Sequence, residues 1–390
     1  MQHVDVVIVG GGLAGSTLAN VVAQQCPALS IAVIEAFVPS NDAPHPSFDD
    51  RSIALAADSV NYLKAHNLFN EHSDYACAIK NVQVSDRGHF GKTQISHQDY
   101  ALDALGYVVE VRPWGHALHR ALSAHPKITQ FCPAKVTAVS MHADHNHITL
   151  DDGTELAAKL TVIADGAQSH TRSLMHLDFH TQQYTQHALI ANVEVQADHQ
   201  GHAYERFTHH GPLALLPMSR KRYSLVWCDE ADKLNELQQL SSDEFVKALQ
   251  DEFGYRAGLF TQVGERSVYP LVWGRINSLV SNRAVVIGNA AHAIHPIAGQ
   301  GFNLGLRDIK ELVARIAYAS DDLGSYAFTS VYAQAREQDI TRVMTLTDGL
   351  VRTFSNSARS IALGRSVGLA SMQLCSSLRQ PLAKQLMGFN

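Results

Sequence analysis

A short apolar run followed at once by glycines is the feature that most restricts how this chain can fold. Residues 4 to 9 read VDVVIV, and GGGLAG then leads into a helical pattern that extends to residue 25. A second apolar run, SIAVIEA, occupies residues 30 to 36. Such runs, rich in β-branched residues, indicate strands buried on both faces. The sequence therefore predicts a βαβ unit, a parallel sheet and an α/β fold.

The glycines have the G-x-G-x-x-G spacing of turns that hold a dinucleotide. Gly10, Gly12 and Gly15 permit a tight turn, close approach of the backbone to a pyrophosphate, and close packing of helix on strand. The helix N-terminus supplies N–H donors and positive potential for the anion. Glu35 ends the second strand, where it can accept hydrogen bonds from ribose hydroxyls. The motif predicts a nucleotide with an adenosine half, either FAD or NAD.

Two later strands end in similar small-residue turns. KLTVIADGA closes one buried strand at residues 159 to 167, and AVVIGNAAHAIHPIAGQG begins another at residue 284. The second turn continues through a proline and glycines into a helical pattern. An NAD-dependent dehydrogenase does not need these two extra sites, whereas a large prosthetic group lying across the sheet does.

Composition limits the class of protein. Of the 390 residues, 46% are apolar and 17% charged, which suits two well-packed domains, or one large domain with an insertion. The net charge of −6 argues against a nucleic-acid partner, because phosphate binding needs a basic face. The cysteines form no CxxC pair, and His142, His145 and His147 fall in a polar turn, so we expect no metal site. With a strand from Val4 and no long apolar run, we expect a cytoplasmic protein, one that can still lie at a membrane surface.

Four ordered segments together resemble one family of flavoenzymes. They are GGGLAG with Glu35, FDDRSIALA at residues 48 to 56, IADGAQSHTR at residues 163 to 172, and GNAAHAIHPIAGQGFNLGLRD at residues 288 to 308. The set is similar to the flavin-dependent aromatic hydroxylases of the p-hydroxybenzoate hydroxylase type, the class A FAD monooxygenases. VSDRGHFG, YALDALGYVVE, ERFTHHGPLALLPMS and SLVWC resemble the ubiquinone-biosynthesis branch, and within it the hydroxylases of 2-polyprenyl-6-methoxyphenol.

The resemblance implies an α/β fold with a discontinuous Rossmann-like FAD-binding domain, an inserted mixed β-sheet substrate domain and a helical C-terminus. Between residues 180 and 275 the sequence itself alternates as antiparallel strands do. We expect the FAD-binding domain at residues 1–75, 100–178 and 275–330, the substrate domain at 76–99 and 179–274, and the C-terminal helical region at 331–390.

The resemblance also implies the cofactor and its chemistry. FAD would lie extended, with its diphosphate near Arg51 and Asn289 and its flavin at residues 299 to 303, where backbone N–H groups would stabilise negative charge. NAD(P)H would visit transiently to reduce FAD, and O₂ would give a C4a-hydroperoxide that attacks an electron-rich prenylated phenol. The implied cofactor-binding residues are Gly10, Gly12, Leu13, Ala14, Gly15, Glu35, Arg51, Asp165, Gly166, Asn289, Gly299, Gly301, Phe302 and Asn303.

The sequence does not identify a catalytic base for the phenol. His295 is the first candidate, because its neighbour Pro296 is expected to face the flavin and line the cavity. Packing explains the other candidates better than catalysis does; they are Tyr204, His209, His210, Tyr223 and His292. Three other functions stay open: hydroxylation of a different ring position, a reductase of the same fold that consumes no O₂, and a flavoprotein scaffold subunit of a biosynthetic assembly.

Asn289 departs from the family pattern. Most relatives have a Gly-Asp pair where this chain has Gly288-Asn289, and the Asp carboxylate there accepts a hydrogen bond from the flavin ribitol. An amide keeps one acceptor but removes a negative charge beside the diphosphate. We therefore expect FAD binding with either residue, and Asn is itself a feature of the 6-methoxyphenol branch.

The C-terminal segment has its own charge pattern. After Asp348 there is no acidic residue, and apolar residues recur between 361 and 374. Five basic residues accompany them: Arg352, Arg359, Arg365, Arg379 and Lys384. A basic amphipathic helix can lie on anionic lipid, dock a partner such as another ubiquinone-biosynthesis protein, or pack on its own domain, and the sequence leaves these three open.

Overall fold

A largely parallel sheet of eight strands carries the predicted glycine turn. At its centre β1 (Gln2–Val9) runs parallel to both neighbours, and its apolar side chains are buried. The predicted βαβ unit is therefore confirmed. The strand order is β17 (Val280–Ser281), β18 (Ala284–Val286), β11 (Glu155–Ile163), β1, β2 (Ile31–Ile34) and β8 (Ile128–Phe131), with β10 (Asn146–Leu150) and β9 (Val136–Met141) added at β11. The computed structural model describes residues 1–38, 51–219, 221–319, 322–354 and 359–389.

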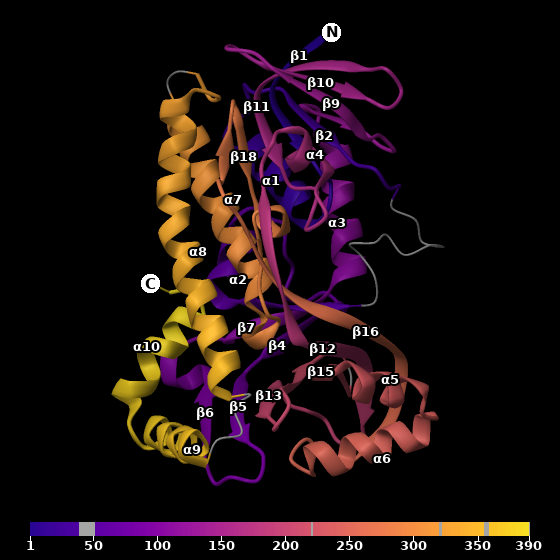
Figure 1. Cartoon of the computed structure of the whole chain (residues 1–390), viewed down its shortest axis with the longest axis vertical. Helices are drawn as coiled ribbons and strands as arrows, with labels where there is room; N and C mark the ends of the chain where they lie inside the picture. Colours follow the sequence, from indigo (N-terminus) through magenta and orange to yellow (C-terminus); the bar gives the residue numbers. More distant parts are fainter. Residues whose placement is uncertain (39–50, 220, 320–321, 355–358, 390) are drawn as a thin grey trace.

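Helices pack on this sheet around the glycine turn. α1 (Leu13–Gln25) begins at the turn and packs against α3 (Val111–Ala124) and α7 (Gln300–Tyr318). α8 (Tyr326–Phe354) runs along α7 on the outside (Figure 1). Apolar residues of the sheet and of these helices form one continuous core. This core fixes the N-termini of α1 and α7 relative to the ends of the strands.

A second eight-stranded sheet forms the inserted layer, at the lower end of Figure 1. Its strands pair antiparallel except β13 with β5, which are parallel, so the predicted mixed sheet is confirmed. α5 (Ala231–Gln239) and α6 (Ser242–Phe253) pack on one face over a separate apolar core. The strand order is β19 (His292–Ala293), β16 (Phe260–Ile276), β12 (Phe179–Val195), β15 (Arg222–Glu230), β14 (Pro212–Pro217), β13 (His202–Phe207), β5 (Asn81–Asp86) and β6 (Lys92–Ser96).

A small antiparallel sheet connects the two parts of the chain. β7 (Gly106–Glu110) pairs with both β3 (Ser52–Ala56) and β4 (Ala76–Ile79), and α2 (Ala57–Ala65) follows β3. β4 begins the predicted substrate domain, yet it pairs with a strand of the predicted FAD-binding domain. The predicted domain boundaries themselves stay a prediction.

The C-terminal region is helical, as predicted. After α8 come α9 (Arg359–Leu374) and α10 (Ser376–Leu386), which lie beside β5 and β6 at the lower left of Figure 1. Within the described residues, no helix combines the length and apolar character needed to cross a bilayer.

Candidate active site

The turn after β1 brings α1 very close to the sheet. Gly10 has φ +102°, and a Cβ there would lie 2.5 Å from the carbonyl oxygen of Ala164, just after β11. A Cβ at Gly15 would lie 1.8 Å from the carbonyl oxygen of Gly10. Gly12 is the N-cap of α1, and the first turn of this helix, fully within the described residues, has neither a side-chain cap nor an acidic residue. The N–H groups at the start of α1 are therefore open to an anion.

Glu35 follows β2 and is buried beside this turn. Its Oε2 accepts a hydrogen bond from the N–H of Gly11 at 2.6 Å, and its Oε1 accepts from the N–H of Phe37 at 2.9 Å. The backbone thus holds the carboxylate in one orientation next to the glycine turn. Its predicted contact with ribose stays a prediction.

The D-G turn after β11 contains a buried acceptor that forms no hydrogen bond among the described residues. Asp165 accepts from the N–H of Thr171 at 3.2 Å through Oδ2, whereas its buried Oδ1 has no hydrogen-bond partner in the described part of the chain. Gly166 has φ +88°, and a Cβ there would meet open space. A ligand with a hydroxyl or amide donor fits this position.

Arg172 joins the D-G turn to the turn after β18. It lies in α4 (His170–Leu174), and its guanidinium donates to the carbonyl oxygens of Ala290 at 2.7 Å and Ala167 at 2.9 Å. The guanidinium also lies 4.1 Å from the ring centre of Phe179. Burial lowers the pKa of Arg172 from its usual value, partly offset by Asp165. The two turns are therefore one structural unit.

α7 begins at Gly299, where the chain is fixed to β3. Gly299 has φ +60°, and a Cβ there would lie 2.8 Å from the Cβ of Ala54. The amide of Asn303 donates to the carbonyl oxygens of Ala54 and Gly299 and accepts from the N–H of Ala56, each at 2.8 Å. These bonds occupy the side chain of Asn303, so its backbone is the part left for a flavin. The first turn of α7 likewise lacks a side-chain cap and an acidic residue.

The remaining predicted residues flank this loop. Gly301 has open space where a Cβ would lie, and Phe302 packs edge-on against Trp114 with ring centres 5.5 Å apart. Arg51 immediately precedes β3, and its carbonyl oxygen accepts from the N–H of Val111 at 3.0 Å. The start of the predicted segment, residues 48 to 50, lies outside the described residues. The cofactor roles of these residues stay predictions.

His295 is buried just before the loop and faces an aromatic neighbour. Its Nδ1 accepts from the N–H of Ile297 at 3.2 Å, which assigns the ring proton to Nε2 in the neutral form. This Nε2 is buried without a partner among the described residues, and the ring lies edge-on to Tyr184 with centres 5.3 Å apart. Burial lowers the pKa of His295 to about 4. This geometry suits a hydrogen-bond donor better than the predicted base. The next residue, Pro296, is exposed.

A buried ion cluster under the turn after β18 was missed from the sequence. Asp308 of α7 is fully buried and accepts from the N–H of Gly288 at 2.9 Å, from His292 at 2.8 Å and from Arg336 of α8 at 2.7 Å. Burial alone would raise the pKa of Asp308, but His292 and Arg336 hold it below its usual value. Asp308 and Arg336 each occupy the apolar stripe of a helix, four residues from buried neighbours, and that position is the signal that could have identified them.

Asn289 lies on the 3₁₀ turn η2 (Gly288–Ala290), and its side chain is exposed. No residue at position 289 supplies the carboxylate that the family pattern has there. Instead, the carboxylate of Asp308 in α7 accepts a hydrogen bond from the N–H of Gly288, the preceding residue. Of the other base candidates, Tyr204 and Tyr223 belong to the core under α6, on the opposite face of the second sheet from the flavin loop.

These donors and acceptors fit an extended dinucleotide. The N–H groups of Leu13 and Ala14 lie in the first turn of α1, and those of Gly301 and Phe302 lie in the first turn of α7. The two helices pack side by side. Helix N-termini without caps favour anions and developing negative charge. The unpartnered Oδ1 of Asp165 adds an acceptor after β11, next to the glycine turn.

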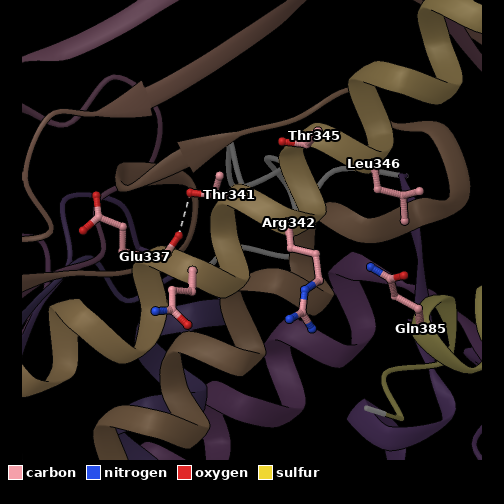
Figure 2. Close-up of a pocket in the computed structure, with 7 residues that line it drawn as sticks. Glu337, Thr341, Arg342, Thr345, Leu346 and Gln385 are labelled. Atoms are coloured by element: carbon pink, nitrogen blue, oxygen red, sulfur yellow. Dashed lines mark hydrogen bonds between the residues drawn. The ribbon is translucent and has the colours of Figure 1, made fainter.

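A separate recess lies between α8 and α10. Figure 2 shows Thr341, Arg342 and Thr345 of α8 near Gln385 of α10. These residues line a space of about 640 Å³. Its lining includes none of the predicted cofactor residues, so we assign it no cofactor role.

Known proteins share this fold. The solved structure of p-nitrophenol 4-monooxygenase PnpA from Pseudomonas putida superposes with a TM-score of 0.79 over 100% of this chain and 99% of that chain, at 16% identity. Among curated relatives, the ubiquinone hydroxylase UbiL of Rhodospirillum rubrum is 34% identical over 98% of this chain and 89% of its own length. The 3-demethoxyubiquinol 3-hydroxylase of Escherichia coli is 29% identical over 99% of both.

A family model described as FAD binding domain matches residues 3–347, a span that includes the glycine turn, the D-G turn and the start of α7. Its match therefore covers both large sheets as well as the helices that begin at the site. The chain belongs to this FAD-binding family and is an FAD-dependent monooxygenase.

Proposed function

We propose that this protein hydroxylates a prenylated phenol in ubiquinone biosynthesis, with 2-polyprenyl-6-methoxyphenol as substrate, as a 2-octaprenyl-6-methoxyphenol hydroxylase does. The names of two relatives, a ubiquinone hydroxylase and a 3-demethoxyubiquinol 3-hydroxylase, support the pathway. Sequence motifs of the 6-methoxyphenol branch, Asn289 among them, support the specific substrate.

The observation that carries this proposal is the cluster of apolar side chains packed around the predicted flavin loop. Ile297, of the 3₁₀ turn η3 (Ile297–Gly299), packs in one cluster with Phe207 of β13 and with Val351 and Leu369 of α8 and α9. An aromatic ring and a prenyl chain are both compatible with such surroundings, and a charged substrate is not.

Each part of the chain has a defined task in this proposal. FAD, when bound, is reduced by NAD(P)H and supplies the transfer of one oxygen atom from O₂ to the ring. The N-terminus of α1 and Glu35 hold the adenosine and diphosphate end. The N-terminus of α7 stabilises negative charge at the flavin. The Nε2–H of His295 offers a hydrogen bond, and the apolar cluster excludes water.

A second candidate is hydroxylation of another ring position in the same pathway, which the name of the Escherichia coli relative favours. Deleting the gene in its host and identifying the accumulating precursor separates the two. Accumulation of a 2-polyprenyl-6-methoxyphenol supports our proposal, and accumulation of a demethoxyubiquinone supports the second candidate. Unchanged quinone levels would contradict both.

Oxygen consumption separates a hydroxylase from the remaining alternatives. Purified enzyme with a short-chain 2-prenyl-6-methoxyphenol should consume O₂ and form hydroxylated product in a one-to-one ratio. A reductase would oxidise NAD(P)H without ring hydroxylation. A scaffold subunit would hold FAD but not turn over, alone or with its partners.

We further propose that α9 and α10 lie on a membrane surface, from which a prenylated substrate would be taken. Leu363, Val367, Leu374 and Leu378 are exposed on these helices and support this idea. Internal ion pairs reduce the predicted basic face, because Arg365 pairs with Asp86. Sedimentation with anionic vesicles tests the proposal, and loss of binding on replacing the exposed leucines with serine is the expected result.

A further inference from the structure

One carboxylate of the second sheet, on the face away from α6, has no hydrogen-bond or ion-pair partner among the described residues. Glu205 lies on β13, where it is half-buried. In the described part of the chain, no side chain or backbone group forms a hydrogen bond or ion pair with its carboxylate. An unpaired acid that is partly removed from water costs free energy, so its position needs an explanation.

Alternation along β13 determines which way Glu205 points. Its neighbour Tyr204 packs into the core under α6. Ala203 and Phe207, two residues to either side, are on the opposite face with Glu205. Its cross-strand partners on that face are Val84 and Ala214, which carry no charge.

The two same-face neighbours of Glu205, Ala203 and Phe207, belong to apolar clusters at the predicted flavin loop and at the strand that supports it. Phe207 belongs to the apolar cluster that contains Ile297 of η3. Ala203 belongs to the cluster against which Ala54 packs, and Ala54 is the residue that supports Gly299. Glu205 therefore lies between two clusters that converge on the flavin loop.

We infer that Glu205 is the catalytic base that receives the phenolic proton of the substrate, an inference that rests on the proposed function. The O–H bond of the phenol breaks, its electron pair stays on the phenol oxygen, and the proton bonds to a carboxylate oxygen of Glu205. The resulting phenolate directs electron density into the ring, which favours attack by an electrophilic oxygen. As the new C–O bond forms, the ring C–H bond breaks and restores aromaticity, and its proton passes through water to the oxygen that is left behind. Glu205 then returns its proton to the phenol oxygen, so that the carboxylate is regenerated.

The environment of Glu205 suits this task. Burial raises its pKa to about 7, closer to the value of about 10 for a phenol than an ordinary carboxyl would be. Nearby titratable groups do not oppose this shift. The charge of Asp86 is paired with Arg365 at 3.0 Å. His295 is neutral, because burial lowers its pKa to about 4. The pKa of the Cys228 thiol is raised, first by burial and then by the charge of Glu205.

The test compares Glu205→Gln with Glu205→Asp, using a short-chain 2-prenyl-6-methoxyphenol and the FAD-loaded enzyme. Glu194→Gln is the matched control, because Glu194 is exposed on β12 of the same sheet. In the wild type, kcat/KM for product should fall about tenfold per pH unit below about pH 7. Glu205→Gln should lower kcat/KM by a factor of about 10² to 10⁴ and abolish this decrease at low pH, the acidic limb of the profile. The FAD content and the midpoint of thermal unfolding should stay unchanged.

Glu205→Asp keeps a carboxylate and should retain both product formation and an acidic limb, at a reduced rate. A Gln variant with wild-type kcat/KM and an unchanged pH profile would overturn the role of Glu205 and leave the proposed function intact. If Glu205→Gln does not fold, a wild-type pH profile of kcat/KM that does not fall below about pH 7 would overturn the role equally. Absence of product from wild type with every prenylated phenol would overturn the proposed function together with this inference.

Discussion

Replacing Asp308 with Asn should destabilise the protein strongly, because it breaks the buried ion cluster under the FAD site. Asp308 accepts three hydrogen bonds, from Gly288, His292 and Arg336. Removal of one partner from a buried ion pair costs about 3 to 5 kcal/mol. Arg336 also pairs with Asp339 at 2.7 Å, which compensates part of its charge. We therefore expect the lower end, a loss of about 3 kcal/mol in the free energy of unfolding.

The assay is urea unfolding of FAD-loaded protein, followed by tryptophan fluorescence and by flavin release. Glu236→Gln is the control, because it breaks an exposed pair with Lys233 and should change the free energy of unfolding by less than about 1 kcal/mol. Asp308→Asn should also lose FAD more readily, because the N–H of Gly288 loses its charged acceptor. A variant that is as stable as the control would refute the reasoning.

The same change predicts a pH dependence with a defined sign. The folded-state pKa of Asp308 lies below its usual value, so its stabilisation is complete above an unfolded pKa of about 3.9. That stabilisation is lost as the pH falls through the lower folded value. The difference in the free energy of unfolding between wild type and Asp308→Asn should therefore decrease below about pH 4 and stay constant above it.

Gly15→Ala should yield protein without FAD, because the new Cβ would lie 1.8 Å from the carbonyl oxygen of Gly10; Gly349→Ala, with open space in α8, is its control in flavin absorbance. Asn289→Asp should retain FAD with at most a modest loss of affinity, and apoprotein from this variant would count against our account. Arg172→Lys should raise the dissociation constant for FAD, since an ammonium cannot bond both turns and lie over the aromatic ring as the guanidinium does; unchanged affinity in a titration would contradict this.

The glycine turn and its strands could be predicted because their signals are local. The run of β-branched residues, the glycine spacing and the position of Glu35 are all read within 36 residues of sequence. The ion cluster could not be predicted in the same way, because Asp308 and Arg336 lie on different helices and meet only when α7 packs on α8. An acid at a buried position of an apolar stripe indicates some partner but not which one.

Glu205 shows a different limit of sequence reasoning. The alternation of β13 is plain, with apolar residues on either side of each polar one, but it does not say which face turns toward the flavin loop. Residue type alone makes Tyr204 and Tyr223 base candidates, and both lie in the core under α6. Only the packing of the folded chain shows that Tyr204 contacts the core under α6, whereas Ala203 and Phe207 belong to clusters on the other face of the sheet.

Two carboxylates beside the predicted FAD site, Glu35 and Asp308, are held by hydrogen bonds that offset their negative charge near a diphosphate. Glu35 is bonded by two backbone N–H groups, and Asp308 by Arg336, His292 and Gly288. Asn289 is exposed on the turn itself and carries no charge. A charge on such an exposed turn would interact by about 1 kcal/mol or less, because solvent screens it. The buried cluster, worth several times more, therefore determines the turn's geometry, and we predict that FAD binds with either Asn or Asp at position 289.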